Sequence, residues 1–278
     1  MRGVGCVWSG GAGRDVGAVV MEWVRAVAAY VVLLGSAMAL SGCGDDVYEW
    51  RQKVSVEVET PGGLRTGSSV QWVKLNVGKG PTDYYGWGIS WKTDGEAVVV
   101  DVSPDAPKGE PRYLFALLIG DSTNYFRGSY GSLGPNGLEA LVGIDQVRDK
   151  FEVGGEPLFG HMARALDALP LGATGEVKGR AMPAFATFAD VDDPSSVKVV
   201  DAQALDRWFG AGVRLKRITI TKTDEPVTEG RIEGVLDWIM RGYVIPPEKQ
   251  PRYVRDQTPE QRLSRRHFVA LADRRHNR

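Results

Sequence analysis

The feature of this chain that most constrains its fold is a pair of alternating segments on either side of a short turn. Residues 53–59 (KVSVEVE) and residues 69–77 (SVQWVKLNV) place apolar and polar side chains at every second position. This period of two is typical of a strand with one buried face. Pro61, Gly62 and Gly63 lie between the segments and favour a turn. We therefore expect an antiparallel hairpin that turns one face toward a core.

Three more strands are expected in the first half of the chain. The segments 87–91, 97–102 and 113–119 are rich in β-branched, aromatic and other apolar residues, which favour strands. Residues 93–96 (TDGE) predict a turn between the first two of these strands, because Asp and Gly are common in tight turns. This half of the chain is therefore predicted to form an antiparallel sheet.

The second half of the chain mixes helical and extended patterns. Residues 138–151 and 158–169 repeat apolar side chains every three or four positions, which predicts two helices. A short helix over 201–209 is expected to begin with Asp201 as its N-cap and to end at Gly210. Strands are expected at 182–188 and 213–223, and a short apolar element at 234–239. The whole pattern predicts an α+β fold, an antiparallel β-sheet of five or more strands with helices inserted mid-chain.

The C-terminal segment, residues 241–278, differs in composition from the rest. It contains ten Lys and Arg residues against four Asp and Glu residues, whereas the whole chain has 34 and 35. Residues 258–261 (TPEQ) have the pattern of a helix start, so we expect a basic helical tail with a helix over 260–274. Two roles are open for this tail: docking on the more acidic remainder of the chain, or attraction to anionic lipid headgroups.

A second informative segment precedes the predicted domain. Glu22 and Arg25 lie at the start of an apolar run that ends in Leu40, Ser41, Gly42 and Cys43. This order of a charged start, a hydrophobic middle and small residues before a cysteine resembles a bacterial lipoprotein signal. The resemblance implies cleavage before Cys43 and a diacylglycerol thioether on its thiol. Such an anchor would hold the protein on the extracytoplasmic (periplasmic) face of the cell membrane or the outer membrane.

The alternatives for this segment are a transmembrane helix and an ordinary secretory signal. Residues 24–40 are interrupted by Arg25 and by Gly35-Ser36. They are therefore shorter than the roughly 20 apolar residues that a membrane span needs. An ordinary secretory signal would not require a cysteine at position 43.

The resulting organisation has four parts. Residues 1–20 are interpreted as an extension upstream of a start at Met21, and residues 21–42 as the lipoprotein signal peptide. Residues 43–240 are predicted to be an α+β extracytoplasmic domain, followed by the Pro-rich and basic tail. The cysteines of the chain are Cys6 and Cys43, so this interpretation leaves the domain without a disulfide. The net charge of −1 gives no indication of nucleic-acid binding.

Two short motifs resemble the first and last blocks of the GDSL-type (SGNH) serine hydrolases. Gly120-Asp121-Ser122 follows an apolar segment, and Asp273-Arg274-Arg275-His276 lies near the C-terminus. The resemblance implies Ser122 as the nucleophile, His276 as the base and Asp273 as the group that orients the imidazole. The G-x-N-D block of that family has no complete counterpart here, and residues 134–137 (GPNG) come nearest to it. A serine esterase is therefore the alternative prediction.

No cofactor or metal site is predicted from the remaining polar residues. His161 and His267 have no partner at the spacing of metal ligands. Asp190, Asp192 and Asp193 lack the regular ligand spacing of a calcium loop, so they are expected to cap turns.

A further resemblance covers most of the region after Cys43. The segments 188–194 (FADVDDP), 209–215 (FGAGVRL) and 223–228 (TDEPVT) look like those of a group of uncharacterised proteobacterial proteins. The resemblance implies a shared fold and no activity. The anchor, without a convincing catalytic constellation, favours a non-catalytic binding or accessory protein of the cell envelope with an envelope protein as partner. Residues 83–87 (DYYGW) are a candidate lining for a ligand groove.

Overall fold

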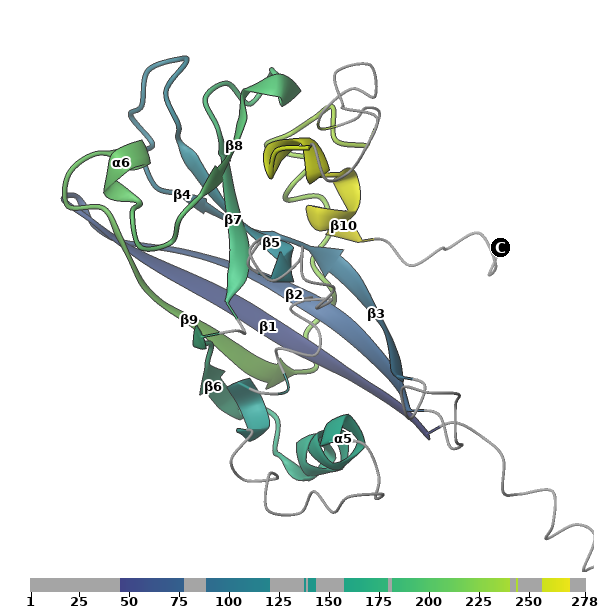
Figure 1. Cartoon of the computed structure of the whole chain (residues 1–278). Coiled ribbons are helices and arrows are strands. Elements are labelled where there is room, and N and C mark those ends of the chain that lie inside the picture. Colours follow the sequence, from purple (N-terminus) through teal and green to yellow (C-terminus); the bar gives the residue numbers. More distant parts are fainter. Residues whose placement is uncertain are drawn as a thin grey trace, which may run out of the picture. The chain divides into compact units, whose positions relative to one another are not determined.

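The structure is a computed structural model that describes residues 46–77, 89–120, 138, 140–143, 158–179, 182–240, 244 and 257–270. The chain divides into two units, Met1–Gly44 and Asp45–Arg278. All the described residues belong to the second unit, whose strands and helices are labelled in Figure 1.

Two antiparallel sheets make up most of the described part of this unit. The larger sheet has six strands in the order β10-β3-β2-β1-β9-β6, and the smaller sheet has four in the order β4-β5-β7-β8. The predicted α+β fold with an antiparallel sheet of at least five strands is confirmed. The elements are β1 (Asp46–Thr60), β2 (Gly63–Val77), β3 (Ile89–Glu96), β4 (Val98–Asp101), β5 (Tyr113–Gly120), α5 (Leu158–Ala168), β6 (Thr174–Glu176), β7 (Pro183–Phe188), β8 (Val197–Val200), α6 (Asp206–Phe209), β9 (Arg214–Thr223) and β10 (Val269–Ala270).

The predicted hairpin is confirmed and forms the centre of the larger sheet. β1 pairs with β2 along its whole length, and a two-residue turn at 61–62 joins the strands. Gly63, the first residue after this turn, has a φ of 108°, a conformation that favours glycine. Every second residue of β1 from Val54 to Val58 is fully buried. The alternation in the sequence therefore corresponds to one core face and one outer face.

The turn predicted at residues 93–96 is wrong, because β3 continues through this segment. Gly95, with a φ of 133°, and Ala97 carry the chain out of the larger sheet and into β4, which pairs with β5. β4 crosses close to β2: a Cβ atom on Gly67 would lie 2.1 Å from the carbonyl oxygen of Val99. The glycine at position 67 therefore permits the two sheets to approach one another.

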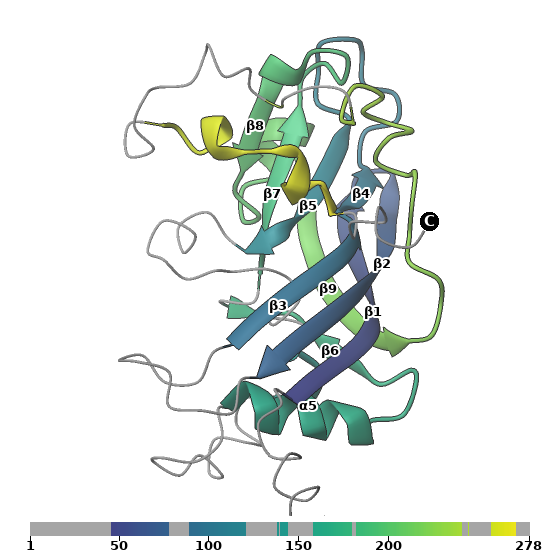
Figure 2. The same cartoon turned by 90° about the vertical axis from the view of Figure 1, so that its right-hand side faces the viewer.

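Three clusters of buried apolar side chains connect the layers. The first lies between the two sheets, and the second lies on the opposite face of the smaller sheet. The third lies between the larger sheet and α5. Figure 2 shows the smaller sheet and α5 near opposite ends of the larger sheet. Representative members are Val54, Val100 and Ile220 in the first cluster, Phe115, Phe188 and Phe268 in the second, and Trp50, Leu75 and Met162 in the third.

A buried chain of polar side chains lies between the first and third clusters. Trp50 Nε1 donates a hydrogen bond to Gln52 Oε1 over 2.9 Å, and Gln52 Nε2 donates to Gln71 Oε1 over 3.3 Å. Gln71 Nε2 in turn donates to the main-chain oxygen of Glu96 over 3.3 Å. Both glutamines are fully buried. Because each amide has partners, their burial is compatible with a stable core.

The helices predicted in the middle of the chain are confirmed in part. α5 falls within the predicted helix 158–169 and contributes Met162, Ala163 and Leu166 to the third cluster. In the predicted helix 138–151, residues 138 and 140–142 are helical, whereas Gly143, with a φ of 76°, is not. Residues 139 and 144–151 lie outside the described residues.

The helix predicted over 201–209 is shorter than expected, since α6 begins only at Asp206. Asp201 is not its N-cap: the Asp201 carboxylate accepts the backbone N–H of Gln203 over 2.9 Å in a separate turn. The helix stops at Gly210, as predicted, where φ is 96°. A polar side chain that bonds its own backbone two residues on competes with helix formation, which explains the late start.

The remaining elements of the second half agree with the sequence pattern. The strands predicted at 182–188 and 213–223 are confirmed as β7 and β9. Asp190 and Asp193 cap turns, as expected, by accepting the N–H groups of Asp192 and Ser195 over 3.0 and 2.9 Å. Residues 230–240 form successive turns that bury Ile232, Leu236 and Ile239 in the second cluster.

The helix predicted over 260–274 is wrong in its described part. The bonds that start it are present, since Gln261 N donates to Thr258 Oγ1 and Thr258 N to Gln261 Oε1. Residues 257–270 nevertheless form two short 3-10 turns and β10, and residues 271–274 lie outside the described residues. Leu263 and Phe268 both enter the second cluster. In a continuous α-helix, residues five positions apart would point about 140° away from each other.

Candidate functional site

The site residues proposed from the sequence all lie outside the described part of the chain. This holds for the candidate ligand groove at 83–87 and for both predicted sites. These predictions stay predictions, and the described residues contain a different candidate. The residues concerned are Leu40, Ser41, Gly42 and Cys43 of the lipidation signal, and Ser122, Asp273 and His276 of the alternative hydrolase.

Within the described residues, no group of three or more His, Cys, Asp or Glu side chains is placed to hold a metal ion. Among the helices of this part of the chain, none combines the length and the apolar character that crossing a bilayer requires.

His267 is a core residue. It is 2% exposed, and its Nδ1 atom accepts the backbone N–H of Ser264 over 3.1 Å. Burial, with a smaller contribution from the Arg266 charge, lowers the pKa of His267 to about 4. The ring is therefore neutral near pH 7, and it supports the turn that delivers Phe268 to the core.

The candidate site is a cleft between the two sheets, with a volume of about 740 Å³. It opens where the edge strands β6 and β8 end before the neighbouring strands β9 and β7 do. β6 pairs with β9 only at Thr219–Thr221, so the first residues of β9 extend beyond it. β8 pairs with β7 only from Phe185 onward. The cleft is lined by Gly179, Met182, Pro183, Ala184, Phe185, Val199, Val200, Asp201, Ala202, Gln203, Arg214 and Leu215.

A bulge in the larger sheet contributes to this geometry. The register between β1 and β9 shifts between Glu57 and Val58, so that Glu57 is opposite Arg217 and Val58 is opposite Leu215. A bulge bends the strand that carries the extra residue and increases its local twist. The start of β9, which lines the cleft, lies immediately beyond this irregularity.

The floor of the cleft is apolar and its rim is polar. Phe185 and Val200 are 2% and 4% exposed and belong to the first cluster, against which Ala202 and Leu215 also pack. The polar lining residues include Asp201, which caps its own turn, and Arg214, which forms a 2.6 Å ion pair with Glu59. The described lining contains no Ser, Cys, His or Lys. The arrangement is suited to holding an apolar group and contains no nucleophile–base pair.

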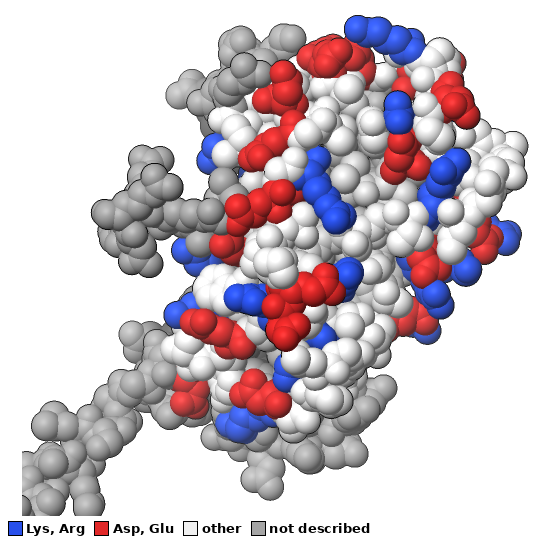
Figure 3. Space-filling view, turned by 180° about the vertical axis from the view of Figure 1, so that it is seen from behind, with Lys and Arg blue, Asp and Glu red and all other residues white. Residues whose placement is uncertain are grey.

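The outer face of the larger sheet offers a different surface, in which charges are paired. Figure 3 shows basic and acidic side chains interspersed over the side of the molecule opposite to that of Figure 1. On β1, Glu57 lies 2.7 Å from Arg217 and 3.7 Å from Lys216. The hydrogen bond from Arg217 is the main cause that lowers the pKa of Glu57. Such paired charges keep a surface soluble without creating a field of one sign.

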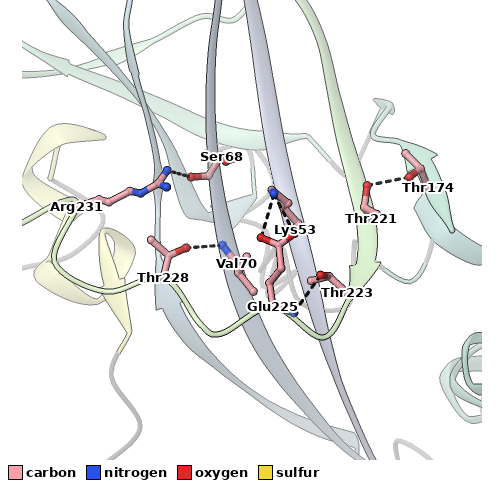
Figure 4. Close-up of polar contacts among 9 residues, drawn as sticks. All are labelled: Lys53, Ser68, Val70, Thr174, Thr221, Thr223, Glu225, Thr228 and Arg231. Atoms are coloured by element: carbon pink, nitrogen blue, oxygen red, sulfur yellow. Dashed lines mark hydrogen bonds and ion pairs between the residues drawn. The ribbon is translucent and has the colours of Figure 1, made fainter. Parts of the chain in front are cut away.

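The segment after β9 crosses this outer face and is fastened to it (Figure 4). Lys53 Nζ contacts both carboxylate oxygens of Glu225 over 3.0 Å. Thr228 Oγ1 accepts the N–H of Val70 over 2.8 Å, and Arg231 Nη1 donates to the carbonyl oxygen of Ser68 over 2.7 Å. The shallow hollow of about 310 Å³ beside these contacts is therefore lined by groups that already bind one another.

No known family model, curated protein or solved structure matches this chain. A fold alone does not define a function, so the functional argument rests on the cleft and on the sequence that precedes the domain.

Proposed function

We propose that the chain is a lipid-anchored extracytoplasmic binding protein, a non-catalytic accessory component of a bacterial cell envelope. The observation that carries the binding role is the cleft between the two sheets, which has an apolar floor and a polar rim. Its two charged lining residues are engaged with the protein itself, through the Asp201 turn and the Arg214–Glu59 ion pair. A site of this kind recognises shape and apolar surface.

The proposed anchor and the cleft belong to opposite ends of β1. Cys43 precedes Asp46, the first residue of β1, by three positions. Arg214 and Leu215 of the cleft are opposite Glu59 and Val58 near the other end of the strand. At about 3.3 Å per residue, twelve or thirteen residues of strand span about 40 Å. The cleft is therefore lined near the end of β1 that is farther along the chain from the proposed lipidation site.

We assign an apolar segment of an envelope protein as the occupant of the cleft. The cleft floor offers the side chains of Phe185, Val200 and Leu215. Burial of apolar area is the main source of affinity for such a contact, at roughly 25 cal/mol per Å² before the costs of association. The polar rim would orient the partner rather than supply most of the affinity.

The test is in-cell cross-linking of a tagged, lipidated protein, followed by mass spectrometry of what co-purifies. Ala202→Phe fills the cleft, and Ala204→Phe makes the same change in the same segment outside the cleft lining. The proposal requires a partner that is lost with Ala202→Phe and kept with Ala204→Phe. Cys43→Ser removes the proposed lipidation site and is expected to release the protein from the membrane fraction.

Two outcomes would contradict the proposal. A partner profile that is the same for the wild type and Ala202→Phe removes the cleft from the binding function. Labelling by a serine-reactive probe that disappears with Ser122→Ala would instead favour the alternative esterase.

A further inference from the structure

We propose a second binding site, at the tip of the hairpin, in which Arg65 binds a single carboxylate group attached to an apolar body. The site is independent of the inter-sheet cleft, and neither proposal requires the other. It rests on the placement of Arg65, on its lack of partners and on the hollow that it lines.

Arg65 lies on the core face of β2. It is directly opposite Val58 of β1, whose side chain is fully buried in the first cluster. Directly opposite residues of an antiparallel pair share one face of the sheet. The neighbouring Leu64 therefore lies on the outer face, where it is 50% exposed. A charge inward and an apolar side chain outward is the reverse of the alternation over residues 53–59, and a local break of this kind is a reason to look for a functional position.

Arg65 has no partner in the described part of the chain. Among the described residues, none forms a hydrogen bond or an ion pair with its guanidinium, and its Nε atom is buried. A buried donor without an acceptor destabilises the folded state, because the donor has lost its water. The structure therefore maintains an unpaired donor at a position where an apolar residue would fit the pattern.

The hollow beside Arg65 has a volume of about 450 Å³. The loop between β4 and β5 forms one wall, and the residues around the end of α6 form another. The loop is held by hydrogen bonds from Ala106 N to Ser103 O and from Glu110 N to Pro107 O. Its prolines restrict it further, so the wall is preorganised. The apolar lining residues include four prolines and two aromatic residues, Pro61, Pro104, Pro107, Pro111, Trp208 and Phe209.

The charges of the hollow favour a monocarboxylate over a phosphate. A guanidinium offers two parallel N–H donors that match the two oxygens of one carboxylate. Asp105 and Glu110 also line the hollow, and both are exposed. These two negative charges would repel a doubly charged phosphate more strongly than a single carboxylate. The proline and aromatic walls would contact the apolar body of the ligand.

The experiment is isothermal titration calorimetry of the full-length chain with three probes that each contain six carbon atoms. We expect saturable binding of hexanoate, and binding at least tenfold weaker for hexanamide and hexyl phosphate. The same carboxylate chemistry also occurs at the C-terminus of a peptide. A short apolar peptide with a free or an amidated C-terminus distinguishes that source: preference for the free peptide over hexanoate would assign the site to chain ends.

Matched variants identify the residue. Arg65→Met is expected to weaken hexanoate binding at least tenfold and to raise the melting temperature of the free chain, because it removes the unpaired donor. Arg65→Lys keeps the positive charge but loses the two parallel N–H donors of the guanidinium, so this variant should bind hexanoate more weakly than the wild type. It also tests binding if the Met variant does not fold. Arg207→Met, an exposed arginine on α6 outside the lining, should bind like the wild type.

Three outcomes would overturn the proposal. These are equal binding of hexanoate and hexanamide, unchanged binding by Arg65→Met, and no saturable binding of either carboxylate probe at millimolar concentration. A lower melting temperature for Arg65→Met together with unchanged binding would assign Arg65 a purely structural role.

Discussion

The carboxylate of Glu96 accepts the backbone N–H of Arg231, over 2.9 Å, although the two residues are 135 positions apart. The same carboxylate accepts the N–H groups of Gly230 and of Ile232, the latter over 3.2 Å. Glu96 is 1% exposed, and burial raises its pKa, while the three N–H donors act in the opposite direction. One side chain at the end of β3 thus holds the first turn of the segment that covers the second cluster.

Replacing Glu96 by Gln should destabilise the fold by about 2–3 kcal/mol, because an amide directs its own N–H₂ group at donors that need an acceptor. The measurement is the midpoint of urea unfolding with an unchanged m-value. Glu233→Gln changes a carboxylate close to the same turn and should alter stability by less than about 0.5 kcal/mol. Equal effects of the two substitutions would mean that charge, rather than the three hydrogen bonds, determines the result.

Stability should fall as the pH decreases from 6.5 to 4, because His267 is buried in its neutral form. Its pKa is about 4 in the folded chain and about 6.5 in the unfolded chain, so the unfolded chain binds a proton first. The contribution is complete above pH 6.5 and decreases by up to about 3 kcal/mol at pH 4.

The control for this pH dependence is His267→Asn, which keeps an acceptor near the position of Nδ1 and does not titrate. This variant should lose the decrease between pH 6.5 and 4 in urea unfolding. The raised pKa of Glu96 acts with the opposite sign, since its contribution is largest below its unfolded pKa and is lost as the pH rises. Parallel stability curves for the wild type and His267→Asn would show that His267 is not the titrating group.

Gly67→Ala should destabilise the protein by about 3 kcal/mol or more, because the new Cβ atom would meet the backbone oxygen of Val99 at 2.1 Å. A backbone atom cannot move aside as a flexible side chain can. Gly62→Ala is the matched control, since its Cβ atom would have no neighbour closer than 3.7 Å. Thermal unfolding of both variants checks the prediction, and a Gly67→Ala protein as stable as the control would rule out the close crossing of β4 over β2.

Phe268→Ala should cost about 3–5 kcal/mol of stability, the usual range for removing a buried aromatic ring. The ring of Phe268 lies 5.8 Å from that of Phe115 and 5.9 Å from that of Phe188, centroid to centroid. Its carbonyl oxygen also accepts the N–H of Ala97 over 2.8 Å. Chemical unfolding gives the magnitude, and hydrogen exchange at Ala97 reports on the docking of β10. Arg265→Ala, at an exposed position of the same segment, should be nearly neutral; a similar loss in both variants would contradict core docking.

Much of the sheet could be predicted from the sequence, because a half-buried strand alternates apolar and polar residues along the chain. The alternation over 53–59 and 69–77 identified both strands of the hairpin and the position of its turn. The turn predicted at residues 93–96 was wrong for a physical reason. Asp-Gly pairs favour tight turns, but here the glycine serves a bend that sends the chain from one sheet to the other.

The candidate sites could not be predicted in the same way. The cleft exists because β6 and β8 stop before their neighbours do, and the ends of paired strands are a property of the tertiary structure. The tail was expected to be helical from its first turn, yet Leu263 and Phe268 are both drawn into one core. The position of Arg65 is marked in the sequence, since Leu64 and Arg65 break the alternation of the hairpin. This break can be interpreted only when the buried face of the sheet is known.

The pairing of β1 has a mechanical consequence. β1 is the first element of the domain and has a hydrogen-bonded neighbour on each side, β2 and β9, both antiparallel to it. The interstrand hydrogen bonds lie perpendicular to the strand. Tension that enters at Asp46 and acts along the strand therefore loads these bonds in shear, many at once, instead of opening them one after another. A tether attached ahead of β1 would therefore pull at a point where the domain resists extension.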